Sequence, residues 1–213
     1  NRYAYSVDSS VVQRIDVVSG ASAVHGMGAT GGLINYMTIS AAEGDDVRQT
    51  FATRLNDSFK GDATSIKSWY SLRHFDAAYD VVIATSWHDQ GLYYDAQGNA
   101  IGMNAIQGET QDSVAKDYFI KLGTNFGDQR LVFSANRYEL ESKHDYLAVK
   151  GNFAAGTPGT VTSGSPTGAP VSNEADAYNL SYSHHDLAGG SLAAQLFYQD
   201  FEAVYGEAGW WPT

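Results

Sequence analysis

Glycine spacing gives this chain a match to a nucleotide-binding motif. Gly26, Gly28 and Gly31 satisfy the pattern GxGxxG, in which glycine backbone approaches a pyrophosphate. A dinucleotide fold needs a strand that runs directly into the first glycine and a helix that opens after the last one. Here seven residues separate Val18 from Gly26, and residues 33–38 are apolar and typical of a strand. We therefore interpret the glycines as a structural turn, and a dinucleotide-dependent enzyme ranks last among the functions considered.

Other reactive side chains are scattered along the chain. On a strand His184 and His185 would point to opposite faces, and His144, Asp145 and Tyr146 have no Ser or Cys nucleophile context. The acidic segments GDDV and NDSFKGD lack the spacing of a calcium-binding EF-hand loop. The six histidines also lack zinc-type helical spacing: His25, His74, His88, His144, His184 and His185. We expect no catalytic residue, no metal site and no cofactor.

Composition narrows the class of protein. The 213 residues include 13 basic and 24 acidic side chains, and the net charge of −11 argues against a nucleic-acid partner. Cysteine is absent, so the chain has no disulfide or thiolate metal site. The 14 Tyr, 9 Phe and 4 Trp suit a β-protein with interfacial aromatics. No apolar run is long enough for a membrane helix, but hydropathy does not detect a membrane-spanning strand.

Alternation of apolar and polar residues predicts about seven strands after residue 43. Each of these strands would have one apolar and one polar face, as in a soluble sandwich or a membrane barrel. The alternation is least regular in residues 130–138. The predicted strands cover residues 47–56, 65–73, 79–88, 117–126, 130–138, 177–183 and 191–198.

The lengths of the connections favour the barrel. They alternate long and short along the chain, which is typical of outer-membrane barrels with short periplasmic turns and longer extracellular loops. The fifth connection contains GNFAAGTPGTVTSGSPTGAPVSNEA, rich in Gly, Ser, Thr, Pro and Ala. By composition it is a flexible loop or a linker between domains. Because the β period resumes at Ala177, we expect an extended surface loop within one barrel.

The segment before these strands has a different pattern. Residues 12–18 form a short apolar run that ends at Gly20, and LINYMTI follows the glycine cluster as a second run. Both runs are rich in β-forming residues, so two strands separated by a glycine-rich turn are predicted.

Residues 14–38, RIDVVSGASAVHGMGATGGLINYMT, resemble the closing segment of the plug domain of TonB-dependent outer-membrane receptors. That family's pattern is approximately R-I-E-V, a basic residue, G-P-x-S-x-x-Y-G, a small residue, G-x-x-G-G-x-I-N. The departures are Ser19 for the basic residue, Ala21 for proline and His25 for tyrosine. The matching positions are Arg14, Ile15, Asp16, Val17, Gly20, Ser22, Gly26, Gly28, Gly31, Gly32, Ile34 and Asn35.

The resemblance implies an all-β fold and a transport function. Residues 1–42 would be the C-terminal part of a plug domain, and residues 43–213 the first strands of a transmembrane antiparallel barrel of about 22 strands. The protein would be a receptor of the Gram-negative outer membrane, not an enzyme. It would take up a scarce ligand, most simply a ferric siderophore, powered by a TonB-type energy-coupling protein of the inner membrane. The chain would then be a fragment that lacks most of the plug.

Ligand contacts are expected from two groups of aromatic residues. Arg2, Tyr3 and Tyr5 would lie on a plug loop that in this family can face the ligand, and Tyr93 and Tyr94 lie in a long connection. A flexible end and solvent-facing loop residues are the competing interpretations. The second functional hypothesis is a soluble or surface-attached β-domain that binds carbohydrate through its aromatics.

A basic set of residues shares the polar face of the first two predicted strands. In a barrel, these side chains would line the lumen and could pair with plug carboxylates. They are Arg48, Arg54, Lys67 and Arg73.

Overall fold

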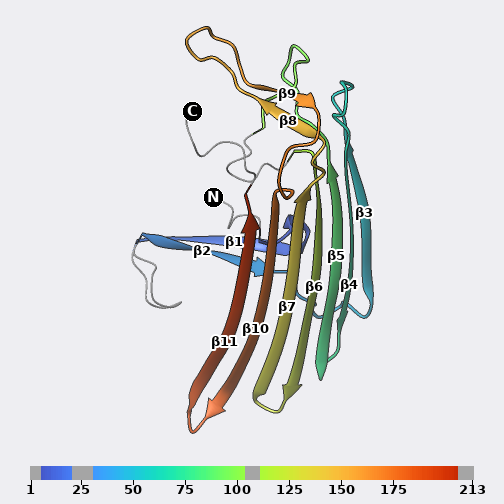
Figure 1. Ribbon diagram of the computed structural model, residues 1–213. Helices are drawn as coiled ribbons and strands as arrows, with labels where there is room; N and C mark the ends of the chain where they lie inside the picture. The colour runs from blue at the N-terminus through green and yellow to red at the C-terminus, as the bar shows by residue number, and fades with distance from the viewer. Residues whose placement is uncertain (1–5, 21–30, 104–110, 206–213) are drawn as a thin grey trace.

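The computed structural model describes residues 6–20, 31–103 and 111–205, and this part of the chain is all-β (Figure 1). Among the described residues, a short 3-10 helix, η2 (Ser9–Val11), precedes the strands. None of the described helical segments has the length and apolar character needed to cross a membrane. The strands are β1 (Val12–Ser19), β2 (Gly32–Thr38), β3 (Arg48–Asn56), β4 (Ser65–Phe75), β5 (Tyr79–Gln90), β6 (Ser113–Phe126), β7 (Gln129–Ser142), β8 (Tyr146–Val149), β9 (Thr160–Ser163), β10 (Ser172–Leu187) and β11 (Gly190–Val204).

Strands β1 and β2 form a separate two-stranded antiparallel sheet, called here the small sheet. Its register places Ile15 opposite Tyr36 and Asp16 opposite Asn35. Gly20, with φ of +92°, follows β1, and Gly32, with φ of +132°, begins β2. Both predicted strands around the glycine cluster are therefore confirmed.

The remaining long strands form one seven-stranded sheet in the order β11-β10-β7-β6-β5-β4-β3. Every neighbouring pair is antiparallel, and all seven strands predicted from the alternating pattern are present. The connections alternate in length as expected. The long ones gather at one end of the sheet, with β8 and β9 beside them, and the short turns lie at the other end (Figure 1).

The seven-stranded sheet has two chemically distinct faces. The small sheet lies across one face, called here the inner face, and the opposite face is the outer face (Figure 1). Many cross-strand neighbours on the outer face are apolar, such as Ile83 with Ile120 and Leu122 with Phe133, although Arg137 and Asp176 form a charged pair on the same face. Many large apolar side chains of this face are exposed: Phe51, Leu55, Tyr79, Ile83, Trp87, Tyr118, Leu122, Phe126, Phe133, Tyr178, Leu180, Leu192, Leu196 and Tyr198. An apolar surface of this extent requires an apolar partner or solvent.

The fifth connection differs from the extended loop that its composition predicts. It contains a second small hairpin in which β8 pairs with β9, from Tyr146 opposite Ser163 to Val149 opposite Thr160. The cross-strand hydrogen bonds of this hairpin satisfy backbone groups of the connection, and composition alone does not predict this pairing. Strand β7 continues to Ser142 and β10 begins at Ser172, so both are longer than predicted.

Candidate functional site

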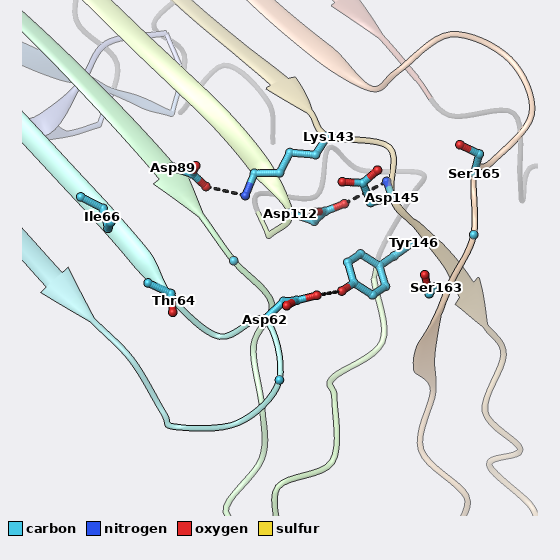
Figure 2. A pocket seen from close by; sticks show the side chains of 13 residues that line it. Asp62, Thr64, Ile66, Asp89, Asp112, Lys143, Asp145, Tyr146, Ser163 and Ser165 are labelled. Carbon is cyan, nitrogen blue, oxygen red and sulfur yellow. Dashed lines mark hydrogen bonds and ion pairs between the residues drawn. The ribbon is translucent and has the colours of Figure 1, made fainter.

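All three long connections contribute to one cavity of about 650 Å³ at their end of the sheet, called here the loop cavity (Figure 2). The connection after β3 supplies Asp62, the one before β6 supplies Asp112, and the one after β7 supplies Lys143 and Asp145. Three hydroxyl side chains, Thr64, Ser163 and Ser165, complete the polar lining. Segments far apart in the sequence therefore form one polar depression.

Polar contacts cross this cavity and hold the connections together (Figure 2). Tyr146 donates a hydrogen bond to Asp62, and Lys143 forms an ion pair with Asp89. The backbone N–H of Asp145 donates to Asp112 Oδ2 at 3.3 Å. Four carboxylates face a single lysine here, so the cavity is acidic.

Two pKa values in the cavity are shifted. The hydrogen bond to Asp62, more than burial, raises the pKa of Tyr146 to about 12, because it stabilises the protonated phenol. Burial raises the pKa of Asp112, since removing water disfavours the carboxylate. At neutral pH the raised pKa keeps the Tyr146 phenol protonated as the donor to Asp62, whereas the raised pKa of Asp112 reflects a carboxylate that burial destabilises.

The tyrosines singled out from the sequence lie near this cavity but are not part of its lining. The hydroxyl of Tyr94 accepts a hydrogen bond from the backbone N–H of Asp62, and a Cβ on Gly61 would lie 2.2 Å from that hydroxyl. Tyr94 therefore supports the fold of the neighbouring connection. Tyr93 is 42% exposed, and its contact with a ligand stays a prediction. Arg2, Tyr3 and Tyr5 lie outside the described residues.

A small apolar cluster joins the small sheet to the inner face. Val11, just before β1, and Ile39, just after β2, lie at the same end of the small sheet and pack with Val82, Ala84 and Phe119 of β5 and β6. Val11 and Val82 are fully buried. Removing these side chains from water gives the contact a non-directional driving force, while flanking polar contacts fix its position.

One flanking contact is made by Lys67 on β4. Its Nζ donates to Asp8 Oδ2 at 2.8 Å and to Ser9 Oγ at 3.1 Å. The backbone N–H of Asp8 donates to Asp117 Oδ2 on β6 at 3.0 Å. Burial acts to raise the pKa of Asp8, but hydrogen bonds from Lys67 and Ser10 outweigh it and lower this pKa. The carboxylate form of Asp8 is therefore favoured, and this is the form that accepts a hydrogen bond from Lys67.

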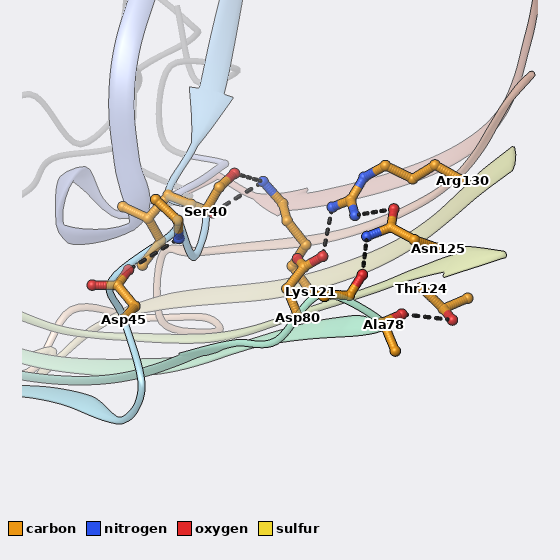
Figure 3. Close-up of polar contacts among 11 residues, drawn as sticks. Ser40, Asp45, Ala78, Asp80, Lys121, Thr124, Asn125 and Arg130 are labelled. Atoms are coloured by element: carbon orange, nitrogen blue, oxygen red, sulfur yellow. Dashed lines mark hydrogen bonds and ion pairs between the residues drawn. The ribbon is translucent and has the colours of Figure 1, made fainter. Parts of the chain in front are cut away.

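The second flanking contact is made by Lys121 on β6 (Figure 3). Its Nζ donates to the carbonyls of Thr38 and Ile39 at 3.2 and 3.0 Å and to Ser40 Oγ at 3.1 Å. These groups lie where β2 ends. The small sheet is thus held to the inner face at one end, by Lys67 just before β1 and by Lys121 where β2 ends.

A buried ion pair lies beside Lys121, toward the short turns (Figure 3). Arg130 NH2 donates to Asp80 Oδ2 at 2.6 Å, and the Asp80 side chain is 2% exposed. Arg130 NH1 also donates to Asn125 Oδ1 at 2.9 Å, and Asn125 Nδ2 donates to the carbonyl of Ala77 at 3.0 Å. Gly123 leaves room for the pair, because a Cβ there would lie 2.2 Å from Asp80 Oδ2.

The predicted basic set is on the inner face. The register places Arg48 opposite Arg73 and Arg54 opposite Lys67, so all four share one face. The pairing with a carboxylate of the preceding segment is confirmed for Lys67 with Asp8. Arg48 instead lies 3.8 Å from Asp45. Asp8, Lys121 and the Asp80–Arg130 pair were not predicted. Alternation with a period of two places Asp80, Lys121 and Arg130 on the polar face, but their partners are distant in sequence, and Asp8 lies before the first strand.

The glycine-rich motif is only partly described. Gly26 and Gly28 lie outside the described residues. Arg14 forms an exposed ion pair with Asp16 at 2.9 Å. A Cβ on Gly31 would meet no atom within 4 Å, whereas one on Gly32 would lie 2.4 Å from the carbonyl oxygen of Val18.

Within the described ranges, no group of three or more His, Cys, Asp or Glu side chains could hold a metal ion.

Two curated relatives match almost the whole chain. The rhizobactin receptor of Rhizobium meliloti (strain 1021) is 23% identical over 201 residues, which are 91% of this chain and 27% of the relative. The ferric aerobactin receptor of Klebsiella pneumoniae is 25% identical over 212 residues, which are 94% of this chain and 28% of the relative. This chain is a relative of TonB-dependent siderophore receptors.

The resemblance in the glycine-rich segment is thereby confirmed at the level of the family. The receptor-like chain spans little more than a quarter of the length of these relatives. Both relatives are named as receptors, not as enzymes. No protein-family model matches the chain, and no solved structure does.

Proposed function

We propose that the chain is part of a TonB-dependent outer-membrane receptor that takes up a ferric siderophore. The observation that carries the proposal is the attachment of the small sheet to the inner face of the seven-stranded sheet, through Lys67 and Lys121. A sheet with a segment docked on one face and exposed apolar side chains on the other is suited to a barrel that encloses a plug in lipid.

In this proposal residues 1–42 are the end of the plug and residues 43–213 begin the barrel. The short turns face the periplasm, and the long connections with their acidic cavity face the medium, as in other outer-membrane barrels. Transport requires the plug to move relative to the wall, and a TonB-type protein of the inner membrane supplies the energy. The function is gated binding, so no covalent chemistry is assigned to any side chain.

The names of the two relatives favour a ferric siderophore over other scarce ligands. The soluble carbohydrate-binding domain is less well supported, because an outer face with Leu196 and Phe51 each 72% exposed would be poorly soluble.

Expression of the intact reading frame in a bacterium without its own ferric chelate receptors tests the proposal. The protein is expected to partition into the outer membrane and to be extracted only by detergent. It should restore growth on at least one ferric chelate, and deletion of the host TonB protein should abolish that growth. A water-soluble product, or TonB-independent growth, would overturn the proposal.

A further inference from the structure

A second cavity lies between the small sheet and the inner face of the larger sheet. It has a volume of about 420 Å³. Strand β2 lines one side, and β6, β7, β10 and β11 line the other. It is separate from the loop cavity, because the two share no lining residue. We call it the inner cleft.

The lining of the inner cleft is polar but uncharged. None of the described residues that line it is Asp, Glu, Lys, Arg or His. This is unusual for a chain with a net charge of −11, and it contrasts with the acidic loop cavity. Five of the lining residues carry a carboxamide: Asn35, Asn136, Asn179, Gln195 and Gln199.

The absence of charge extends along the inner face of the last two strands. Alternation places Ala177, Asn179 and Ser181 of β10 on this face, opposite Gln199, Phe197 and Gln195 of β11. On the outer face the adjacent positions include Asp176, opposite Asp200. Charge is therefore present on these strands but directed away from the cleft.

Asn136 contributes a nearly buried carboxamide to the wall of the cleft. Its side chain is nine-tenths buried, and Nδ2 donates to Asp117 Oδ2 at 3.2 Å. Its Oδ1 has no hydrogen-bond partner among the described residues. A buried carbonyl oxygen without a donor is costly, but this oxygen has almost no accessible surface, so it lies in the wall beneath the cleft and out of reach of a ligand.

A carboxamide pair is already ordered beside it. Gln195 Nε2 donates to Asn179 Oδ1 at 2.6 Å, which leaves Asn179 Nδ2 and Gln195 Oε1 to contact a ligand. Each carboxamide both donates and accepts hydrogen bonds, so the set matches amides and hydroxyls. The rings of Tyr36, Phe119 and Phe197 add apolar surface.

We propose that the inner cleft is a subsite for an uncharged, amide- and hydroxyl-rich part of the transported chelate. This proposal rests on the receptor function proposed above and specifies the chemical class of its ligand. A neutral group exchanges its water contacts for carboxamide contacts at little cost. An anionic group would lose hydration without meeting a counter-charge in the lining, because the nearby Lys121 ammonium already donates to the carbonyls of Thr38 and Ile39 and to Ser40. The subsite therefore selects neutral over anionic chelates.

The test uses the intact receptor in cells and two probes, a neutral ferric trihydroxamate and a trianionic ferric tricatecholate. Wild-type receptor should take up the neutral probe in preference. Gln199→Lys places a positive charge in the cleft and should raise the ratio of anionic to neutral uptake about tenfold, and Gln199→Glu should lower it. The control is Gln97→Lys on an exposed connection, which should leave the ratio unchanged.

Gln199 is exposed on the inner face, so both variants should reach wild-type abundance in the membrane. Preferred uptake of the trianionic probe, or a ratio unaffected by both Gln199 variants, would overturn the subsite while leaving the receptor function intact. Failure of every ferric chelate to enter through the receptor would overturn the proposed function, and the subsite with it.

Discussion

Lys67 and Asp8 form an ion pair of 2.8 Å that links the start of the small sheet to strand β4. Both side chains are largely removed from water, with exposures of 16% for Lys67 and 9% for Asp8. The two residues are 59 positions apart in the sequence. The pair and the Lys121 contacts with Thr38, Ile39 and Ser40 determine where the small sheet docks.

Substitution of Asp8→Asn should weaken this attachment by about 3 kcal/mol, because it removes the carboxylate that accepts a hydrogen bond from the largely buried Lys67 ammonium. Hydrogen–deuterium exchange of the intact receptor should show faster exchange in residues 6–11. The matched control is Asp16→Asn, which removes an exposed ion pair with Arg14 and should cost less than about 1 kcal/mol. Equal effects of the two substitutions would show that the Lys67–Asp8 ion pair does not hold the small sheet in place.

The same attachment should weaken only in acid. The pKa of Asp8 is lowered in the folded state below its ordinary value of 3.8. Its contribution to stability is therefore complete above that value and is lost as pH falls through the lower folded pKa. Exchange protection of residues 6–11, corrected for intrinsic rates, should decline below about pH 4. Asp8→Asn should remove this acid decline, and an equal decline in the wild type and the variant would refute the role of Asp8.

Adjacent glycines of the plug-like motif should differ in their tolerance of alanine. At Gly32, φ is +132° and a Cβ would lie 2.4 Å from the Val18 carbonyl oxygen, so Gly32→Ala must disturb the β1–β2 pairing. At Gly31 a Cβ would meet no atom within 4 Å, so Gly31→Ala is the control. We expect Gly32→Ala to cost about 1–3 kcal/mol, measured by exchange of the β2 amides. A larger effect at Gly31 would show that the motif acts through other contacts.

Charge on the outer face should impair membrane insertion. Ile83 is 45% exposed on that face, within the apolar surface. Ile83→Arg should destabilise the protein in lipid by about 2–4 kcal/mol if this position lies near the bilayer midplane, measured as reduced abundance in the outer membrane. Ala193→Arg, on the exposed inner face of β11, should have little effect. Similar abundance of the two variants would argue against lipid at the outer face.

The loop cavity offers a spectroscopic test of its central hydrogen bond. Asp62 is the main cause of the raised pKa of Tyr146, which is about 12. Asp62→Asn should return the pKa toward about 10, seen as earlier phenolate absorbance in an alkaline titration. Tyr146→Phe identifies the signal by removing it. An unchanged titration in Asp62→Asn would show that the two side chains are not in contact.

The local pattern of the sequence was enough to predict the class of fold. Alternation with a period of two located all seven strands of the large sheet and assigned residues such as Ile83 and Lys67 to opposite faces. The alternating connection lengths placed the long connections at one end, and the glycine-rich segment indicated the resemblance to TonB-dependent receptors that the two relatives support. These features arise from residues that are close together in the chain, so they can be predicted from the sequence alone.

The tertiary structure decided which distant residues meet. The partners of Lys121 lie 81 to 83 positions away, and no local period indicates such a contact. The β8–β9 hairpin was missed because a loop rich in Gly, Ser and Thr gains its strands from cross-strand pairing, not from propensity. The inner cleft depends on Asn35 of the small sheet lying near Gln199 of the last strand. Sequence fixes which face each side chain occupies, but only the docking of one sheet on the other brings those faces together.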